Sequence, residues 1–124
     1  MFTVDTSSKV PIYEQIKKQI MELIHVGALK PHDQLPPMRQ LALELGINFN
    51  TVKRAFGDLE ADGVIYTFVG RGSFIAENAL GSEKLQKDAE KALRAAISAA
   101  FVTGITLKRA HEAVDEIFQE KVKK

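Results

Sequence analysis

The sequence contains no cysteine, so neither disulfide bonds nor thiolate metal ligands are available to this chain of 124 residues. No stretch approaches the roughly 18 consecutive apolar residues of a membrane-spanning helix. The N-terminus also lacks the basic segment and following apolar segment of a secretory signal peptide. These absences predict a soluble, cytoplasmic protein without a membrane partner.

Charge of one sign is not in excess. Lysine and arginine together number 17 and aspartate and glutamate 16, which leaves a formal net charge of +1. The total charge therefore indicates no particular partner, and any case for nucleic-acid binding must rest on where the basic residues lie. With 45% hydrophobic and 27% charged residues, the composition is that of a globular protein with one modest domain, or a small domain with an appendage.

Residues that would support catalysis or metal binding are scarce. His25, His32 and His111 do not have the spacing of metal ligands, and there is no serine nucleophile motif. The Gly-Arg-Gly sequence at residues 70–72 is too short for a phosphate-binding loop. We therefore expect neither an enzyme, nor a cofactor, nor a bound metal.

The hydrophobic pattern predicts three helices in the first half of the chain. Apolar residues at helical spacing after Pro11 indicate an amphipathic helix that stops near Gly27. A turn-rich linker leads to a short helix that ends at Gly46, and a further helix runs from about Asn48 to Asp62.

The second half begins with a change of period. Residues 64–77, VIYTFVGRGSFIAE, have the pattern of two β-strands around a Gly-Arg-Gly turn, which predicts a hairpin. From Gly81 onward the chain is helical again, in two pieces that separate near Gly104. The predicted order is three helices, a hairpin and a helical tail.

The second and third helices match the helix-turn-helix pattern. A close crossing needs a small residue and a turn residue that tolerates positive φ, and Ala42 and Gly46 meet these needs. Leu45, Ile47 and Val52 can fill the wedge between the two helices. In this motif the N-terminal end of the second helix enters the major groove of DNA.

The start of that second helix is unusually polar. Four apolar residues form its expected buried face: Val52, Ala55, Phe56 and Leu59. Asn48 is the expected N-cap, whereas Asn50, Lys53 and Arg54 point away from the buried face. Asn50 and Thr51 are not needed for capping, and they suit base edges and phosphates respectively. A polar helix face can also be merely solvated, so the helix alone leaves this alternative open.

The hairpin favours DNA binding over that alternative. Its glycines let the backbone approach a surface closely while Arg71 reaches outward, as a wing beside a duplex would. An ordinary hairpin with an exposed arginine has the same appearance. A helix-turn-helix followed directly by such a hairpin is less often a coincidence than either feature alone, and the combination predicts a winged helix.

The stretch that carries these features resembles the GntR family of bacterial transcriptional regulators. It covers roughly residues 10–77, and it contains the family landmarks LPxxRxLA, NxNTVxxA, LexdG and GrGsF at the family's spacing. The short tail that follows is similar to that of the YtrA-like subfamily, whose members use a pair of C-terminal helices chiefly for dimerisation.

The resemblance implies DNA contacts at three places: an arginine of the first motif helix, the start of the recognition helix, and the wing tip beside the minor groove. The residues at or beside these positions are Arg39, Asn48, Phe49, Asn50, Thr51, Lys53, Arg54, Gly70, Arg71 and Gly72. Two of them have alternatives. Arg54 could instead pair with Asp58, and Phe49 could be partly buried, as we expect, or could pack on a thymine methyl group.

Two departures from the family pattern affect the linker and the first motif helix. His32 stands where the family often has glycine, although histidine tolerates a left-handed conformation better than most residues. Pro37 replaces the usual capping serine, so a side-chain cap and any phosphate contact that it made are not expected here.

The tail carries two apolar stripes. The first is rich in alanine and comprises Leu85, Ala89, Leu93, Ala96, Ile97, Ala100 and Phe101; the second comprises Leu107, Ala110, Val114, Ile117 and Phe118. These stripes could complete the core, but a closed winged helix leaves little core to cover, which favours dimerisation. The expected contact residues are Leu85, Leu93, Ile97, Phe101, Leu107, Val114, Ile117 and Phe118.

Together these features predict a mainly α-helical protein with a small β-hairpin. The expected domains are a winged helix-turn-helix over residues 1–77 and a helical dimerisation tail over residues 78–124. The predicted function is that of a sequence-specific transcriptional regulator, a repressor by family habit, which binds double-stranded DNA as a homodimer on an inverted-repeat operator. The alternative is a winged helix that binds proteins instead of DNA. The residues identify no small-molecule effector.

Overall fold

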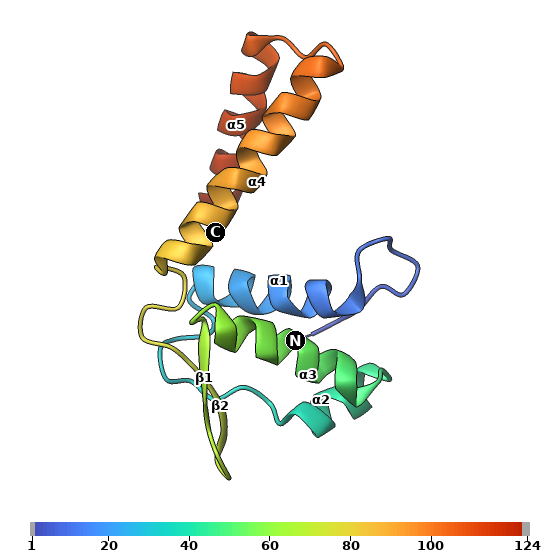
Figure 1. The fold of residues 1–124 in the computed structure, drawn as a ribbon, viewed down its shortest axis with the longest axis vertical. Helices are drawn as coiled ribbons and strands as arrows, with labels where there is room; N and C mark the ends of the chain where they lie inside the picture. The colour runs from blue at the N-terminus through green and yellow to red at the C-terminus, as the bar shows by residue number, and fades with distance from the viewer. Residues whose placement is uncertain (1, 123–124) are drawn as a thin grey trace. The chain divides into compact units, whose positions relative to one another are not determined.

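The computed structural model describes residues 2–122, which form five helices and one two-stranded antiparallel hairpin (Figure 1). The mainly helical architecture with a small hairpin confirms the predicted fold class. The chain divides into two compact units, one extending to Leu85 and the other beginning at Gln86.

The first unit contains three helices and the hairpin. Its helices are α1 (Ile12–His25), α2 (Met38–Leu45) and α3 (Phe49–Ala61), and its strands are β1 (Ile65–Phe68) and β2 (Gly72–Ile75). In Figure 1, α1 lies above α3, whereas α2 and the tip of the hairpin lie below α3, on the side away from α1. We call the hairpin the wing.

The turn between α2 and α3 has the local chemistry that the sequence predicts. Gly46 ends α2 in the left-handed conformation, with φ of 65°, and Ile47 then donates its N–H to the Ala42 carbonyl at 3.0 Å. Asn48 caps α3, because its Oδ1 atom accepts the N–H of Asn50 at 2.7 Å. The helix-turn-helix is therefore closed by one glycine and one asparagine.

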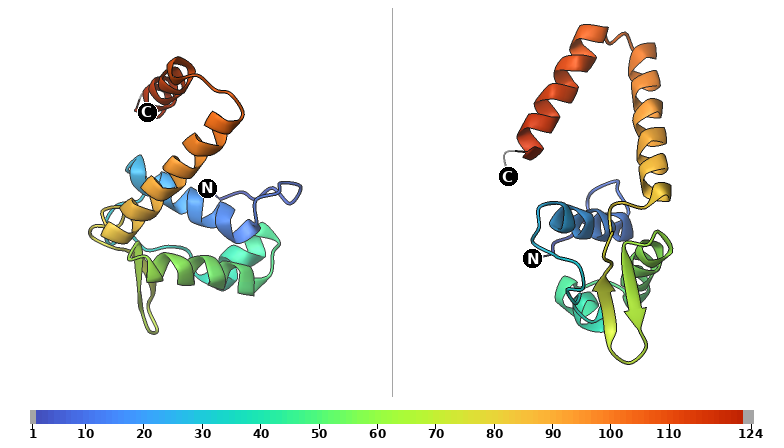
Figure 2. Two further views of the ribbon diagram at one scale, coloured as in Figure 1. Left: turned by 45° about the horizontal axis from the view of Figure 1, so that its top comes forward. Right: turned by 90° about the vertical axis from the view of Figure 1, so that its left-hand side faces the viewer.

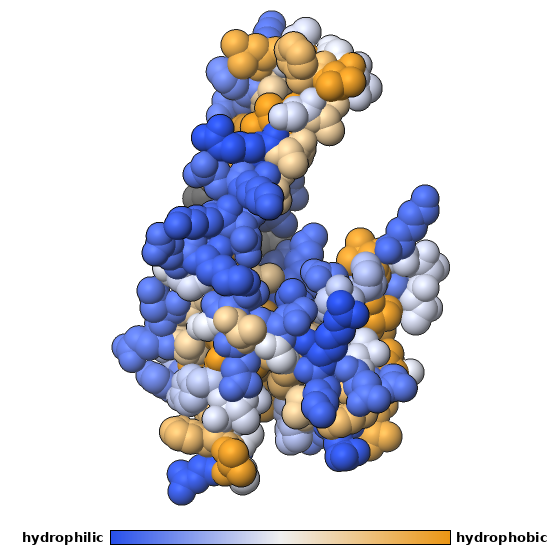
Figure 3. All heavy atoms as spheres, in the orientation of Figure 1, coloured by the Kyte–Doolittle hydropathy of each residue, from blue (hydrophilic) through white to orange (hydrophobic). Residues whose placement is uncertain are grey.

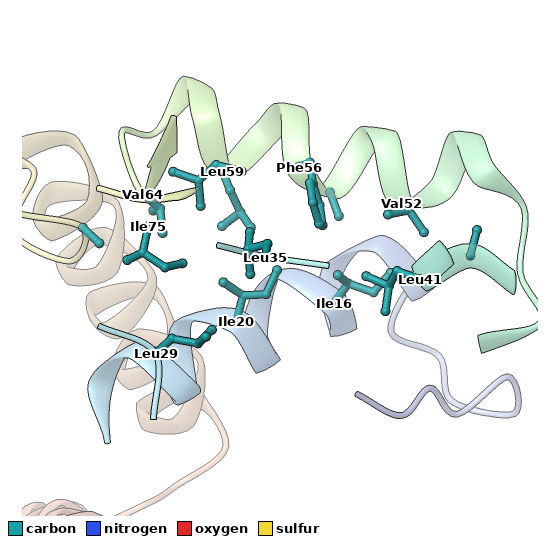
Figure 4. Close-up of a cluster of buried hydrophobic side chains, with 14 residues drawn as sticks. Ile16, Ile20, Leu29, Leu35, Leu41, Val52, Phe56, Leu59, Val64 and Ile75 are labelled. Atoms are coloured by element: carbon teal, nitrogen blue, oxygen red, sulfur yellow. The ribbon is translucent and has the colours of Figure 1, made fainter. Parts of the chain in front are cut away.

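The core of this unit lies between the three helices and the inner face of the wing (Figure 4). All four residues of the predicted α3 face are buried, and they meet Ile16 and Ile20 of α1. The other buried hydrophobic residues are Leu29, Leu35, Leu41, Ala42, Val64, Ile65, Ile75 and Ala79. Complete burial of a Leu or Ile side chain stabilises a fold by about 1.5–3 kcal/mol, so this cluster is what holds α3 in place.

The wing pairs Ile65 with Ile75 and Phe68 with Gly72, which places alternate residues on opposite faces. The inner face carries Ile65, Ile75 and the buried Ser73. The outer face is aromatic: the Tyr66 and Phe74 rings stack with their centroids 5.5 Å apart, and Phe68 packs edge-on against both. The sequence pattern did not predict this aromatic face.

The second unit is helical. Helix α4 (Glu83–Val102) enters it from the first unit, and α5 (Leu107–Val122) follows after a turn at residues 103–106. The two helices diverge from this turn (Figure 2), and no residue of α4 is buried. Among the described residues, no helix combines the length and apolar character needed to span a membrane.

Large apolar side chains of the tail are exposed, and Figure 3 shows an apolar group of atoms at the end where α4 and α5 are joined. The exposed fractions are 54% for Leu93, 49% for Ile97 and 76% for Phe101. On α5 the exposed members are Leu107, Val114, Ile117 and Phe118. Leu85 differs from all of these, because it is partly buried against the core of the first unit.

Candidate nucleic-acid interface

The first turn of α3 presents its polar side chains to solvent. Asn48, Asn50 and Lys53 are exposed, and Thr51 is partly exposed. Position 52 between them is completely buried, which fixes the helix rotation and keeps its neighbours outward. The Asn50 side chain does not cap the helix, since the cap hydrogen bond is donated by its backbone N–H.

Arg39 of α2 lies directly beside this turn. Its guanidinium carbon is 4.3 Å from the centroid of the Phe49 ring, close enough for a cation–π interaction. Arg39 is exposed, and none of residues 2–122 makes a hydrogen bond or ion pair with its guanidinium. A guanidinium that rests by its face on an aromatic ring keeps its N–H donors at the edge, where they can bind a phosphate or a guanine.

Phe49 itself is partly buried and packs against the core, as expected from its place at the edge of the apolar face. Its ring therefore has core on one side and Arg39 on another. This second contact joins α2 to α3 across their turn, and sequence reasoning had not considered it.

Arg54 also lies on an aromatic ring, but its environment is different. Its guanidinium carbon is 3.8 Å from the centroid of the Tyr13 ring, and Nη2 donates to the Tyr13 hydroxyl at 3.0 Å. The alternative pairing with Asp58 is not what the structure shows, because Lys17 donates to the Asp58 carboxylate at 3.3 Å. Tyr13 was missed from sequence because it lies 41 positions from Arg54, and only the packing of α1 on α3 brings them together.

Lys17 links the two helices electrostatically. Burial alone would lower its pKa, but the hydrogen bond with Asp58 and the charges of Glu14, Asp58 and Asp62 together raise the pKa above its ordinary value. The lysine therefore stays charged at neutral pH, and its contact with Asp58 supports the position of α3 on α1.

The wing tip carries the second basic element. Arg71 is exposed, and its N–H donates to the Phe68 carbonyl at 2.9 Å, which closes the turn. Beside it, Val69 is 99% exposed and Phe68 is 56% exposed, and Figure 3 shows this apolar tip at the bottom of the view. The tip thus combines one cation with apolar side chains.

Comparison with known proteins identifies the family to which this winged helix belongs. Residues 12–75 match the model of the family described as "Bacterial regulatory proteins, gntR family". The chain is 42% identical over 120 residues to the HTH-type transcriptional repressor YtrA of Bacillus subtilis (strain 168), and the match covers 94% of this chain and 92% of that protein. The chain belongs to the GntR family.

Solved structures of other transcription factors share this fold. A transcriptional antiterminator from Listeria monocytogenes EGD-e superimposes with a TM-score of 0.87 at 35% identity, covering 98% of this chain and 92% of that one. AraR(DBD) in complex with operator ORE1 superimposes with a TM-score of 0.53 at 30% identity, covering 59% of this chain and 89% of that one. This GntR-family chain is accordingly a transcriptional regulator with the family's DNA-binding domain, and not an enzyme.

The structure shows how the chain accommodates both departures from the GntR pattern. His32 adopts φ of 70°, and its ring contacts the Tyr66 hydroxyl through Nδ1 at 2.8 Å and Glu77 through Nε2 at 3.1 Å. Histidine thus takes the left-handed position of the usual glycine and ties the linker to the wing. Pro37 stands at the N-cap of α2 and makes no side-chain cap, as predicted. Within the described residues, no group of His, Asp and Glu could hold a metal ion.

Proposed function

We propose that this protein is a sequence-specific repressor that binds an inverted-repeat operator as a homodimer. The observation that carries the proposal is the juxtaposition of exposed Asn50 and Lys53 on α3 with the Arg39 guanidinium on α2, which contacts the Phe49 ring and has no hydrogen-bond acceptor within residues 2–122. Together they form an edge of hydrogen-bond donors and acceptors at the end of the helix that enters the major groove in this motif.

The roles within this edge follow from chemistry. The carboxamide of Asn50 can pair with a base edge, since the amide of asparagine matches the donor and acceptor of adenine. The Asn48 carboxamide accepts the Asn50 N–H through Oδ1, so its own N–H donors are what it could offer to DNA. Thr51, Lys53 and Arg39 suit phosphates, and Arg39 could also pair with a guanine. Phe49 belongs to this surface through its contact with Arg39.

The wing supplies the third group of proposed contacts. Gly70 and Gly72 flank Arg71 and let the backbone approach the minor groove, where the arginine would bind phosphate or a narrow A·T-rich segment. Arg54 is a weaker candidate, because one of its donors is already bound to Tyr13. The operator complexes of AraR(DBD) support DNA binding by a domain of this fold, and the repressor YtrA supports repression over activation.

The homodimer is proposed from the tail. Its predicted contact residues other than Leu85 are all exposed and recur at helical spacing along α4 and α5, and grouped exposed apolar residues mark interaction sites. A second copy of α4 and α5 would cover them with an equivalent surface, as a twofold interface requires. We propose that the dimer contacts lie in the second compact unit, from Gln86 onward, and that the first unit binds DNA.

A protein–protein module is the competing function, and the exposed Phe68 and Val69 of the wing are the observation in its favour. Salt separates the two functions. Specific DNA binding should weaken by orders of magnitude between low and moderately high salt because bound counterions are released, whereas an apolar protein interface should change little.

The proposal is tested by selecting bound fragments from the genomic DNA of the source organism and footprinting the enriched sites. We expect an inverted repeat in which each half-site is protected by one protomer, with half-sites about one helical turn apart, or a multiple of it. Recovery of no enriched sequence, or of single half-sites bound with full affinity, would contradict the proposal.

A further inference from the structure

The segment that precedes α2 pairs with the wing. The Leu35 N–H donates to the Ser73 carbonyl at 2.9 Å, the Ile75 N–H donates to the Asp33 carbonyl at 2.9 Å, and Gln34 lies opposite Phe74 in an antiparallel bridge. Strand β2 therefore has hydrogen-bonded neighbours on both sides, β1 on one and residues 32–35 on the other. The wing is tied to the linker rather than standing alone.

The side chain of Gln34 extends this pairing to the turn. Its Nε2 donates to the Arg71 carbonyl oxygen at 2.8 Å, across 37 positions of sequence. Because the Arg71 N–H is already bound to the Phe68 carbonyl, both backbone polar groups of the wing arginine have partners. One of these two hydrogen bonds belongs to the turn itself, and the other comes from Gln34.

Gly72 provides the space for that second hydrogen bond. A Cβ at this position would lie 2.8 Å from Nε2 of Gln34, which is closer than such atoms approach, and its φ of 113° is disfavoured for any residue with a side chain. Glycine at the end of the turn thus allows the carboxamide to reach the Arg71 carbonyl.

We propose that Gln34 is a positioning residue, which holds the Arg71 backbone so that the wing arginine meets DNA in one defined place. The inference rests on the proposed DNA-binding function of the wing. A hairpin of two four-residue strands has little stability of its own, so its tip needs an external contact to be ordered. From Gln34 the chain runs through Leu35 and two prolines into α2, so the residue that holds the wing turn lies close in sequence to Arg39.

The test uses Gln34→Met in the full-length protein. Methionine keeps the length of the side chain, removes the donor and adds no charge that would itself repel phosphates. The first measurement is made without DNA: amide hydrogen exchange of Arg71 should be several-fold faster than in the unaltered protein, with the exchange of Ile75 and the melting temperature unchanged. Gln119→Met, an exposed glutamine-to-methionine change on α5, is the matched control and should leave the wing unaffected. Unchanged exchange at Arg71 would overturn the proposal.

The second measurement is a double-mutant cycle of affinity for the selected operator. Gln34→Met should weaken binding about three- to tenfold, the range expected for the loss of one hydrogen bond, and should have no further effect in the Arg71→Ala background. An equal loss in both backgrounds, or unchanged affinity despite faster exchange, would overturn the positioning role. If no operator is found, the proposed function fails, whereas the exchange result still decides whether Gln34 holds the turn.

Discussion

At the scale of single residues, the two arginines that rest on aromatic rings differ in what their donors do. Arg54 donates to the Tyr13 hydroxyl, whereas the donors of Arg39 have no partner among residues 2–122. The first arginine therefore contributes mainly to the contact of α1 with α3. The Arg39 guanidinium is already oriented by Phe49, so it should lose little conformational entropy when it binds DNA.

Asn48 and Asn50 should separate stability from recognition. Asn50→Ala should weaken operator binding by about 1–3 kcal/mol and leave the melting temperature unchanged, since its side chain is exposed and makes no cap. Asn48→Ala should lower the free energy of unfolding by about 1 kcal/mol through the lost N-cap.

Lys53→Ala, like Asn50→Ala, should leave the melting temperature unchanged, but it should weaken binding to all DNA sequences alike. Thermal melting and gel-shift titration of each variant measure both effects, and full affinity of Asn50→Ala would exclude its role.

Phe49 can be tested against the thymine contact that remains its alternative. Phe49→Leu keeps an apolar side chain but loses the ring under Arg39, so it should weaken operator binding, and Arg39→Ala should weaken it at least as much. If Phe49 acts through Arg39, the double variant should bind no more weakly than Arg39→Ala alone. A further loss in the double variant, removed when deoxyuridine replaces thymine in the operator, would instead identify a methyl contact.

At the scale of elements, the wing is a short hairpin whose tip carries one cation, Arg71, beside exposed apolar side chains. Removing the single cation by Arg71→Ala should lower affinity across sequences more uniformly than Asn50→Ala does. One lost phosphate contact should also flatten the slope of log affinity against log salt by about one unit. Titrations at several salt concentrations check this, and an unchanged slope would mean that Arg71 stays solvated in the complex.

The elements were largely predictable from the sequence because their signals are local. The third helix was expected from about Asn48 to Asp62, and α3 runs from Phe49 to Ala61 with those two residues as its caps. Its buried face, the left-handed Gly46 and the hairpin all follow from periodicity and turn chemistry within a few neighbouring positions.

The contacts that give these elements their functional surfaces were not predictable in the same way. Tyr13 with Arg54 and Gln34 with Arg71 join residues 41 and 37 positions apart. No periodic pattern reports a side chain that reaches another element, because such a contact depends on how the elements pack. Arg39 with Phe49 spans only the helix-turn-helix, yet it too required the packing of α2 on α3.

At the scale of the whole molecule, the first compact unit ends after the predicted domain boundary. Ala79 is buried and Leu85 packs on the core, so a chain cut near Asn78 would lose core contacts, whereas one cut after Leu85 would keep them. A truncated protein that ends at Leu85 should retain the fold of the winged helix but should be monomeric. It should also bind the operator far more weakly than the full chain. Light scattering and gel-shift titration decide this; a monomer that binds as tightly as the full chain would show that the tail has another purpose.

A single charge should have a similar effect in the full-length chain. Phe101→Glu places a carboxylate within the exposed apolar surface of α4 and should yield monomers, because burying an unpaired charge in an interface is strongly unfavourable. Lys108→Glu, at the exposed second residue of α5 and outside the apolar stripe, is a control for charge alone and should leave the dimer intact. Dimers of Phe101→Glu with unchanged stability would place the interface elsewhere.

The diverging helices of the tail have a consequence for regulation. Since α4 and α5 leave their apolar residues exposed, a pair of copies would form only at sufficient concentration, and operator occupancy would then rise with the square of the amount of protein at low levels. A modest change in synthesis or degradation of the regulator would thus be converted into a sharper change in transcription. If the proposed dimer forms in this way, transcription would depend directly on the number of copies of the regulator in the cell.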